Sequence, residues 1–111
     1  MQAKSVTAVK AELAGLGPVL PGSISKQWNV CGKPGCRCKD PKHPQRHGPY
    51  CQLSFTVAGR SSTMFLKPKE VAGARRCLRR YRRFRELNAQ FVTAYVAQAR
   101  RSGVAALAEG R

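Results

Sequence analysis

Three cysteines within eight residues are the part of the sequence best suited to chemistry. They are Cys31, Cys36 and Cys38, in a C-x4-C-x-C pattern whose spacers contain two glycines and a proline suited to a sharp turn. Zinc prefers thiolate and imidazole donors arranged as a tetrahedron, and these donors commonly come from a tight turn plus one later element. The pattern therefore predicts a structural zinc site, in preference to a metal-free turn or to redox chemistry of the thiols.

A tetrahedral zinc site needs a fourth ligand, for which the sequence offers His43, His47 and Cys51. We prefer His47, because it directly precedes a Gly-Pro pair where the chain turns into a strand, so that ligation would pin the loop to that strand. Cys51 is the main rival. It alternates with two large apolar residues in the pattern of a half-buried strand, which favours a place in the core.

The remaining residue types argue against an enzyme. The chain has only five carboxylates, and no phosphate-binding glycine loop or nucleophile-elbow motif occurs in it. Asp40 is the only carboxylate near the cysteines, so a catalytic zinc would have little help from a general base. Cys77 lies on the apolar side of an expected helix and is predicted to be a core residue. We expect zinc to stabilise a domain that is too small to rely on its core alone.

Arginine dominates residues 75–85, where it fills seven of eleven positions. At 100° per residue, five of these arginines fall within an arc of about 120° on one side of a helix. They are Arg75, Arg76, Arg79, Arg82 and Arg83. The same helix contains only Glu70 and Glu86 as acids, too few to neutralise this side. Because guanidinium groups bind phosphate in a bidentate manner, we predict contacts to nucleic-acid phosphates, in preference to acidic lipid or acidic protein.

The loop that holds the cysteines is also basic, which predicts a second nucleic-acid contact through Lys33, Arg37 and Lys39. The whole chain of 111 residues has 21 Lys and Arg against five Asp and Glu, a formal net charge of +16. Such an excess favours a polyanionic partner, and we favour DNA over RNA. No secretory signal and no membrane-spanning run is evident. We therefore expect a cytoplasmic protein without a membrane partner, in a compartment where thiols stay reduced and available to metal.

The elements that must position these residues follow from the hydrophobic pattern. A short helix is predicted at 5–16, capped by Ser5, and a β-hairpin is predicted from strands at 51–57 and 63–66. Residues 18–25 read as a connector, and a long helix is predicted from about 67 to 101. The expected class is α+β: a zinc-stapled loop and a hairpin packed on a long basic C-terminal helix. We divide the chain into an N-terminal helix or arm (1–19), the main domain (20–101) and a flexible tail (102–111).

The side of the long helix opposite the arginines is apolar and aromatic, and it extends beyond what a two-stranded hairpin can cover. Its outer part comprises Phe84, Leu87, Phe91, Tyr95 and Val96. This pattern supports an alternative function, in which the chain is an interaction or oligomerisation subunit of a larger nucleoprotein complex. A homodimer, or a partner protein bound through the aromatic side, is the corresponding expectation.

Residues 20–90 resemble a family of small bacterial proteins of unknown function. The resemblance rests on five segments: Leu20-Pro-Gly-Ser-Ile-Ser, Cys31-Gly-Lys-Pro-Gly-Cys-Arg-Cys, His47-Gly-Pro-Tyr50, Lys67-Pro-Lys-Glu and Tyr81-Arg-Arg-Phe-Arg-Glu-Leu87. Members share a C-G-K-x-x-C-x-C…H-G-P-Y core and often occur among transposon-associated genes. The resemblance implies a zinc-loop, hairpin and helix module linked to mobile DNA, and it supplies no established activity. Our leading hypothesis is an accessory role in a DNA transaction such as transposition. Cys51 departs from the aromatic residue usual after H-G-P-Y, which keeps this cysteine open as a ligand.

Overall fold

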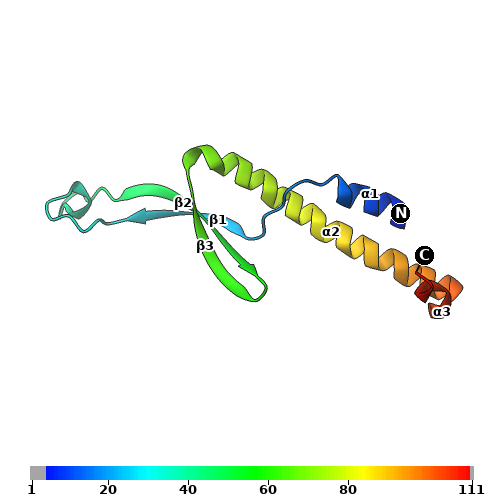
Figure 1. The fold of residues 1–111 in the computed structure, drawn as a ribbon. Coiled ribbons are helices and arrows are strands. Elements are labelled where there is room, and N and C mark those ends of the chain that lie inside the picture. The colour runs from blue at the N-terminus through cyan, green and yellow to red at the C-terminus, as the bar shows by residue number, and fades with distance from the viewer. Residues whose placement is uncertain (1–4, 111) are drawn as a thin grey trace. The chain divides into compact units, whose positions relative to one another are not determined.

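The computed structural model describes residues 5–110 and confirms the α+β class (Figure 1). In chain order the elements are α1 (Val6–Ala14), β1 (Ser23–Asn29), the short 3₁₀ helix η1 (Arg37–Lys39), β2 (His47–Val57), β3 (Arg60–Leu66), the 3₁₀ helix η2 (Pro68–Glu70), α2 (Val71–Ser102) and α3 (Val104–Ala108). No helix within the described residues is long and apolar enough to cross a bilayer.

The described residues form two compact units, which we treat separately. One unit, here called the sheet unit, comprises residues 20–78, and the other, the helical unit, comprises residues 5–19 and 79–110. The sequence prediction, by contrast, kept residues 20–101 together as one main domain. The segment predicted to be a flexible tail contains the five-residue helix α3.

The sheet unit contains three antiparallel strands in the order β1-β2-β3, where the sequence predicted only a hairpin. The additional strand, β1, begins within the segment read as a connector. Its pattern gave little indication of a strand, because only Ile24 and Ser25 are half-buried and its other residues are exposed. Pairing with β1 also explains why β2 begins at His47 and not at Cys51 as predicted: Gln27 pairs with Tyr50, and Asn29 pairs with His47.

One face of the sheet carries the small core of this unit. Leu53 of β2 is fully buried, and Cys51 and Phe55, which alternate with it, are half-buried, as the period-two pattern predicted. Ala74, in the first turns of α2, and Cys38, in the loop between β1 and β2, are also buried in the sheet unit. The opposite face of β2 presents Gln52, among other polar side chains. Because so small a core stabilises the fold only weakly, a bound metal could supply a large share of the free energy of folding.

The turn between β2 and β3 consists of Ala58 and Gly59, with φ values of 53° and 77°. Positive φ at both central residues of a two-residue loop is the type I′ geometry that suits the twist of a hairpin. Glycine and asparagine adopt this conformation readily, whereas for other residues it costs about 1–2 kcal/mol. Ala58 is therefore a strained residue at an otherwise favourable turn.

We expect Ala58→Asn to stabilise the protein by up to about 1 kcal/mol, because asparagine relieves the strain at positive φ. Urea unfolding of the full-length protein measures this change. Gly59→Ala is the matched control and should destabilise by a similar amount, since no atom lies within 4 Å of the added methyl group and only the backbone conformation is penalised. Equal stabilities for the two variants would contradict the assigned turn.

The helical unit is built from α1 and the greater part of α2. Ser5 caps α1 as predicted, its hydroxyl accepting a hydrogen bond from the N–H of Ala8 at 3.2 Å, and the helix ends at Ala14, two residues earlier than expected. Val9 of α1 and Leu87 of α2 are fully buried within this unit. The start of α2 also follows the prediction, because η2 precedes it and the Glu70 carboxylate accepts the N–H of Lys67 at 2.9 Å.

Candidate metal centre

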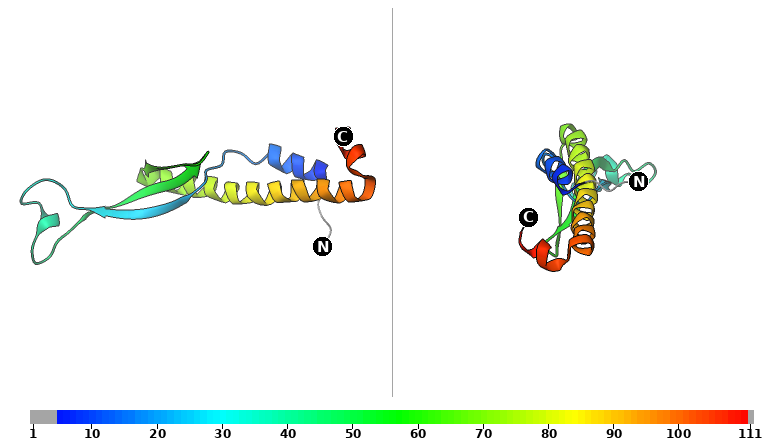
Figure 2. Two further views of the ribbon diagram at one scale, coloured as in Figure 1. Left: turned by 90° about the horizontal axis from the view of Figure 1, so that it is seen from below. Right: turned by 90° about the vertical axis from the view of Figure 1, so that its right-hand side faces the viewer.

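The long connection between β1 and β2 brings four donor side chains together. Cys31 lies just after β1, and His47 is the first residue of β2, so the pairing of these strands holds the two ends of the loop side by side. Cys36 and Cys38 come from the turn around η1. Figure 1 and the left-hand view of Figure 2 place this loop at the end of the sheet opposite the β2–β3 turn.

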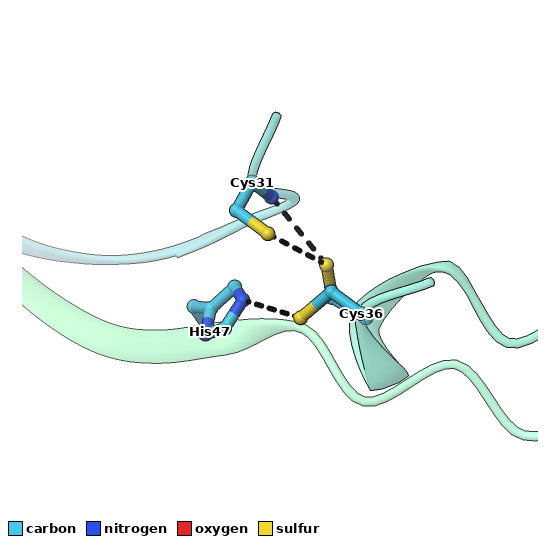
Figure 3. A group of neighbouring side chains, drawn as sticks. Cys31, Cys36 and His47 are labelled. Carbon is cyan, nitrogen blue, oxygen red and sulfur yellow. Dashed lines mark hydrogen bonds between the residues drawn. The ribbon is translucent and has the colours of Figure 1, made fainter. Parts of the chain in front are cut away.

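The donor atoms lie close enough together to share one metal ion. All four lie within 4.8 Å of one another. The Sγ atoms of Cys31 and Cys38 are 3.6 Å apart, and the Cys36 Sγ is 3.3 Å from the Nε2 of His47 (Figure 3). Zn–S bonds of ~2.3 Å and Zn–N bonds of ~2.0 Å in a tetrahedron give separations of about 3.8 Å between sulfurs and about 3.5 Å between sulfur and nitrogen. The Cys3His cluster therefore fits zinc.

The rival fourth ligands lie outside this cluster. His43 is exposed, and its backbone N–H, together with that of Lys42, is bonded to the carboxylate of Asp40 at 3.3 Å and 2.9 Å respectively. Asp40 thus closes a turn beside the metal site. Cys51 is half-buried on the core face of the sheet with Leu53. The cluster accordingly contains the three predicted cysteines and the preferred histidine.

Backbone geometry directly after the histidine explains why the H-G-P-Y segment has a glycine at its second position. Gly48 has a φ of 132°, and a β-carbon at this position would lie 2.7 Å from the carbonyl oxygen of Gln27. It would also lie 3.2 Å from Cδ1 of Trp28, next to the irregularity in the β1–β2 pairing between Gln27 and Asn29. Only glycine allows β2 to approach β1 this closely and so to present His47 to the thiols.

The thiols differ in how readily they ionise. A hydrogen bond from the backbone of Cys38, followed by bonds from the thiols of Cys31 and Cys38, lowers the pKa of Cys36 from 9.0 to about 6. Burial raises the pKa of Cys38, the backbone N–H of Cys31 opposes this shift, and the thiols of Cys36 and Cys31 add to it. Cys36 is therefore a thiolate at neutral pH in the metal-free protein, the form that ligates a metal. Metal binding must displace the proton from Cys38.

Most of the predicted nucleic-acid-binding residues are exposed. Arg75 and Arg76 of α2 belong to the sheet unit, and Arg79 and Arg82 belong to the helical unit. Within residues 5–110, none of these four side chains makes an ion pair with a carboxylate. The loop residues Lys33, Arg37 and Lys39 are exposed as well, and they lie in the same loop as the three cysteines.

Arg83 differs from the other predicted phosphate ligands. Its guanidinium forms a two-pronged contact with the carboxylate of Glu12 in α1, with N···O distances of 2.8–3.1 Å, and a further bond of 2.9 Å to Glu86. Glu86 is three positions along the helix and could have been predicted from sequence spacing. Glu12 is 71 positions away, and nothing in the local sequence indicates this pairing. Arg83 therefore has a structural partner within the helical unit.

The aromatic side of α2 is only partly buried. Leu87 is fully buried, and Phe91 packs edge-on against Tyr95 with ring centroids 5.0 Å apart. Val92 and Val96, by contrast, remain 60% and 47% exposed. The interaction with a second copy or a partner protein through this side of the helix stays a prediction.

Comparison with known proteins gives one match. Residues 3–76 match the model of the family described as a domain of unknown function, DUF6788, and this range includes α1, the sheet, the metal cluster and the first turns of α2. No curated protein and no solved structure shows a significant match. Since the family model spans more than half of the sequence, the chain belongs to the DUF6788 family.

Proposed function

We propose that the protein is a zinc-stabilised nucleic-acid-binding accessory protein that prefers DNA. The observation that carries this proposal is the set of exposed arginines without a carboxylate partner in the described chain: Arg75, Arg76, Arg79 and Arg82. A net charge of +16 would oppose a compact fold unless a polyanion relieved the repulsion. Nucleic acid supplies phosphates at a density that matches these side chains.

The metal centre is proposed to have a structural role. Zinc would be held by Cys31, Cys36, Cys38 and His47, which together fill the four tetrahedral positions and leave none for substrate. Bound there, zinc would cross-link the loop to the end of β1 and the start of β2, and it would supply no catalytic step. The zinc would thus fix Lys33, Arg37 and Lys39 on an ordered loop as a second set of phosphate contacts.

We further propose that the DNA transaction belongs to a mobile element. This step rests on the C-G-K-x-x-C-x-C…H-G-P-Y resemblance, whose members often occur among transposon-associated genes. An accessory role suits a small basic module without a recognisable catalytic motif. The role would be to hold or shape DNA for a separate recombination enzyme.

The test is the salt dependence of binding by the full-length zinc-loaded protein. If the four arginines each neutralise one phosphate, they contribute about −3.6 to the slope of log K against log salt on duplex DNA. Fluorescence anisotropy with a labelled duplex and a labelled single strand measures this slope. A slope close to zero on both would contradict nucleic-acid binding, and tighter binding of an RNA of the same sequence at equal salt would contradict the preference for DNA.

A further inference from the structure

A cavity of about 580 Å³ opens beside the metal cluster in the sheet unit. Its lining includes three of the four metal ligands, and the other lining residues are Asn29, Lys33, Tyr50 and Phe65. This volume lies within the range typical of small-molecule sites, so the cavity has room for a planar ring system. Neither the metal cluster nor the arginines of α2 account for its two aromatic side chains.

The two aromatic residues lie on the solvent face of the sheet. Phe65 of β3 pairs with Gln52 of β2, and Tyr50 lies two residues before Gln52, so all three side chains share one face. Leu53, the buried residue of this unit, points to the opposite face. Phe65 is 64% exposed and Tyr50 is 41% exposed, and their rings meet edge to face with centroids 6.4 Å apart. The core therefore does not explain these rings.

Polar side chains that can form hydrogen bonds surround the rings on the same face. The strand pairing places Ser25 beside Gln52 and Gln27 beside Tyr50. Further along this face, the hydroxyl groups of Thr56 and Ser61 lie 2.8 Å apart. Aromatic rings on an open sheet, among amide and hydroxyl groups, form the kind of platform on which proteins stack unpaired bases.

We propose that Tyr50 and Phe65 bind an unpaired base of a single-stranded nucleic acid in this cavity, one ring stacking on the base and the other, perpendicular to it, contacting the base edge. Lys33, at the cavity wall, would hold an adjacent phosphate, and the Asn29 amide would lie within the same cavity to contact a base edge. The metal ligands Cys31, Cys36 and His47 form the remaining wall. Bound zinc would therefore hold this wall in place, and the base would contact the aromatic rings. This inference rests on the proposed nucleic-acid binding and adds a preference for unpaired strands.

Charge favours a nucleic acid over a protein as the occupant. Residues 20–78 contain eleven Lys and Arg and only two carboxylates, Asp40 and Glu70. Asp40 is bonded to two backbone N–H groups, and Glu70 caps the start of η2. An apolar ring pair within a strongly cationic unit matches a ligand that combines flat apolar bases with regularly spaced anions.

The test compares two variants on two ligands, using the full-length zinc-loaded protein. Anisotropy titrations are made with a labelled twelve-nucleotide DNA strand and with the duplex of the same sequence. Phe65→Leu and Tyr50→Leu, which retain bulk but remove the ring, should each weaken single-strand binding by about tenfold and change duplex binding less than twofold. A strand of the same length made of abasic nucleotides should bind the wild type about tenfold more weakly than the normal strand.

Three controls separate stacking from loss of structure. Phe65→Trp keeps an aromatic ring and should retain single-strand affinity. Met64→Ala removes a 46% exposed apolar side chain from the opposite, core face of β3, where it pairs with Leu53, and should leave single-strand affinity unchanged even if it lowers stability. Zinc content measured on each variant should equal that of the wild type, because neither ring is a metal ligand.

The outcomes distinguish this inference from the proposed function. Steeply salt-dependent binding that Phe65→Leu and Tyr50→Leu leave unchanged would overturn the base-stacking site and leave nucleic-acid binding intact. Failure of the wild type to bind either ligand would overturn both. A dimer that Phe65→Leu converts to a monomer, with unchanged single-strand affinity, would assign the rings to a protein interface and overturn the inference.

Discussion

Cys36→Ser is expected to abolish stoichiometric zinc binding and to unfold the loop between β1 and β2. The wild type should hold one zinc ion per chain, since the described residues contain one Cys3His cluster. In zinc-finger peptides a structural zinc contributes about 10–16 kcal/mol, which is comparable with or larger than the whole stability of a small domain. Serine is a far weaker zinc ligand than thiolate, so most of this contribution is lost. Metal analysis of purified protein and thermal unfolding by circular dichroism measure the two effects.

Cys51→Ser is the matched control for this experiment. It makes the same chemical change at a half-buried cysteine outside the cluster, and it also tests the rival fourth ligand. We expect it to retain the zinc, whereas His47→Ala should lose it or bind it much more weakly. The reverse result, zinc retained in His47→Ala and lost in Cys51→Ser, would show that the fourth ligand is wrongly assigned. A wild-type protein that folds without metal would remove the structural role of zinc.

Replacing Arg75, Arg76, Arg79 and Arg82 together by glutamine is expected to weaken duplex binding on the order of a hundredfold or more near 0.1 M salt. The slope of log K against log salt should become shallower by about 3.6, because each lost phosphate contact removes about 0.9 from it. All four side chains are exposed, so the fold should change little. Anisotropy titrations over a range of salt concentrations measure both quantities.

Arg83→Gln provides the contrast to the fourfold variant. It also removes a positive charge from α2, but this guanidinium is held by Glu12 and Glu86. We expect little change in the salt slope and a lower melting temperature, because Glu12 and Glu86 lose their shared partner. A slope reduced by about one in Arg83→Gln would show that phosphate competes successfully for this side chain. An unchanged slope in the fourfold variant would place the phosphate contacts elsewhere.

The metal cluster was predictable because its determinants are local in sequence. A short spacing with glycine and proline between thiols limits the turn that can form, and zinc chemistry limits the donors that can complete it. The choice among three fourth ligands depended on strand position. Register decided it: the pairing of Asn29 with His47 puts this histidine at the mouth of the loop, while Cys51 is carried to the core face.

The helices and the β2–β3 hairpin could also be predicted from the sequence, because helix capping and apolar periodicity depend on residues only a few positions apart. Strand β1 was missed because it is nearly all exposed and so has little apolar alternation to detect. Its existence depends on hydrogen bonds to β2, which is a property of the pairing and not of the segment.

The sequence by itself determined the three cysteine donors, the excess of arginine on α2 and the α+β class, whereas the strand register decided the fourth donor. Only the tertiary structure decided which charges are already paired and which rings are left exposed. Arg83 and Glu12 meet although 71 positions separate them, and Tyr50 and Phe65 share a face through the register of β2 and β3. Such contacts join segments that do not restrict one another locally, so their formation depends on the fold as a whole.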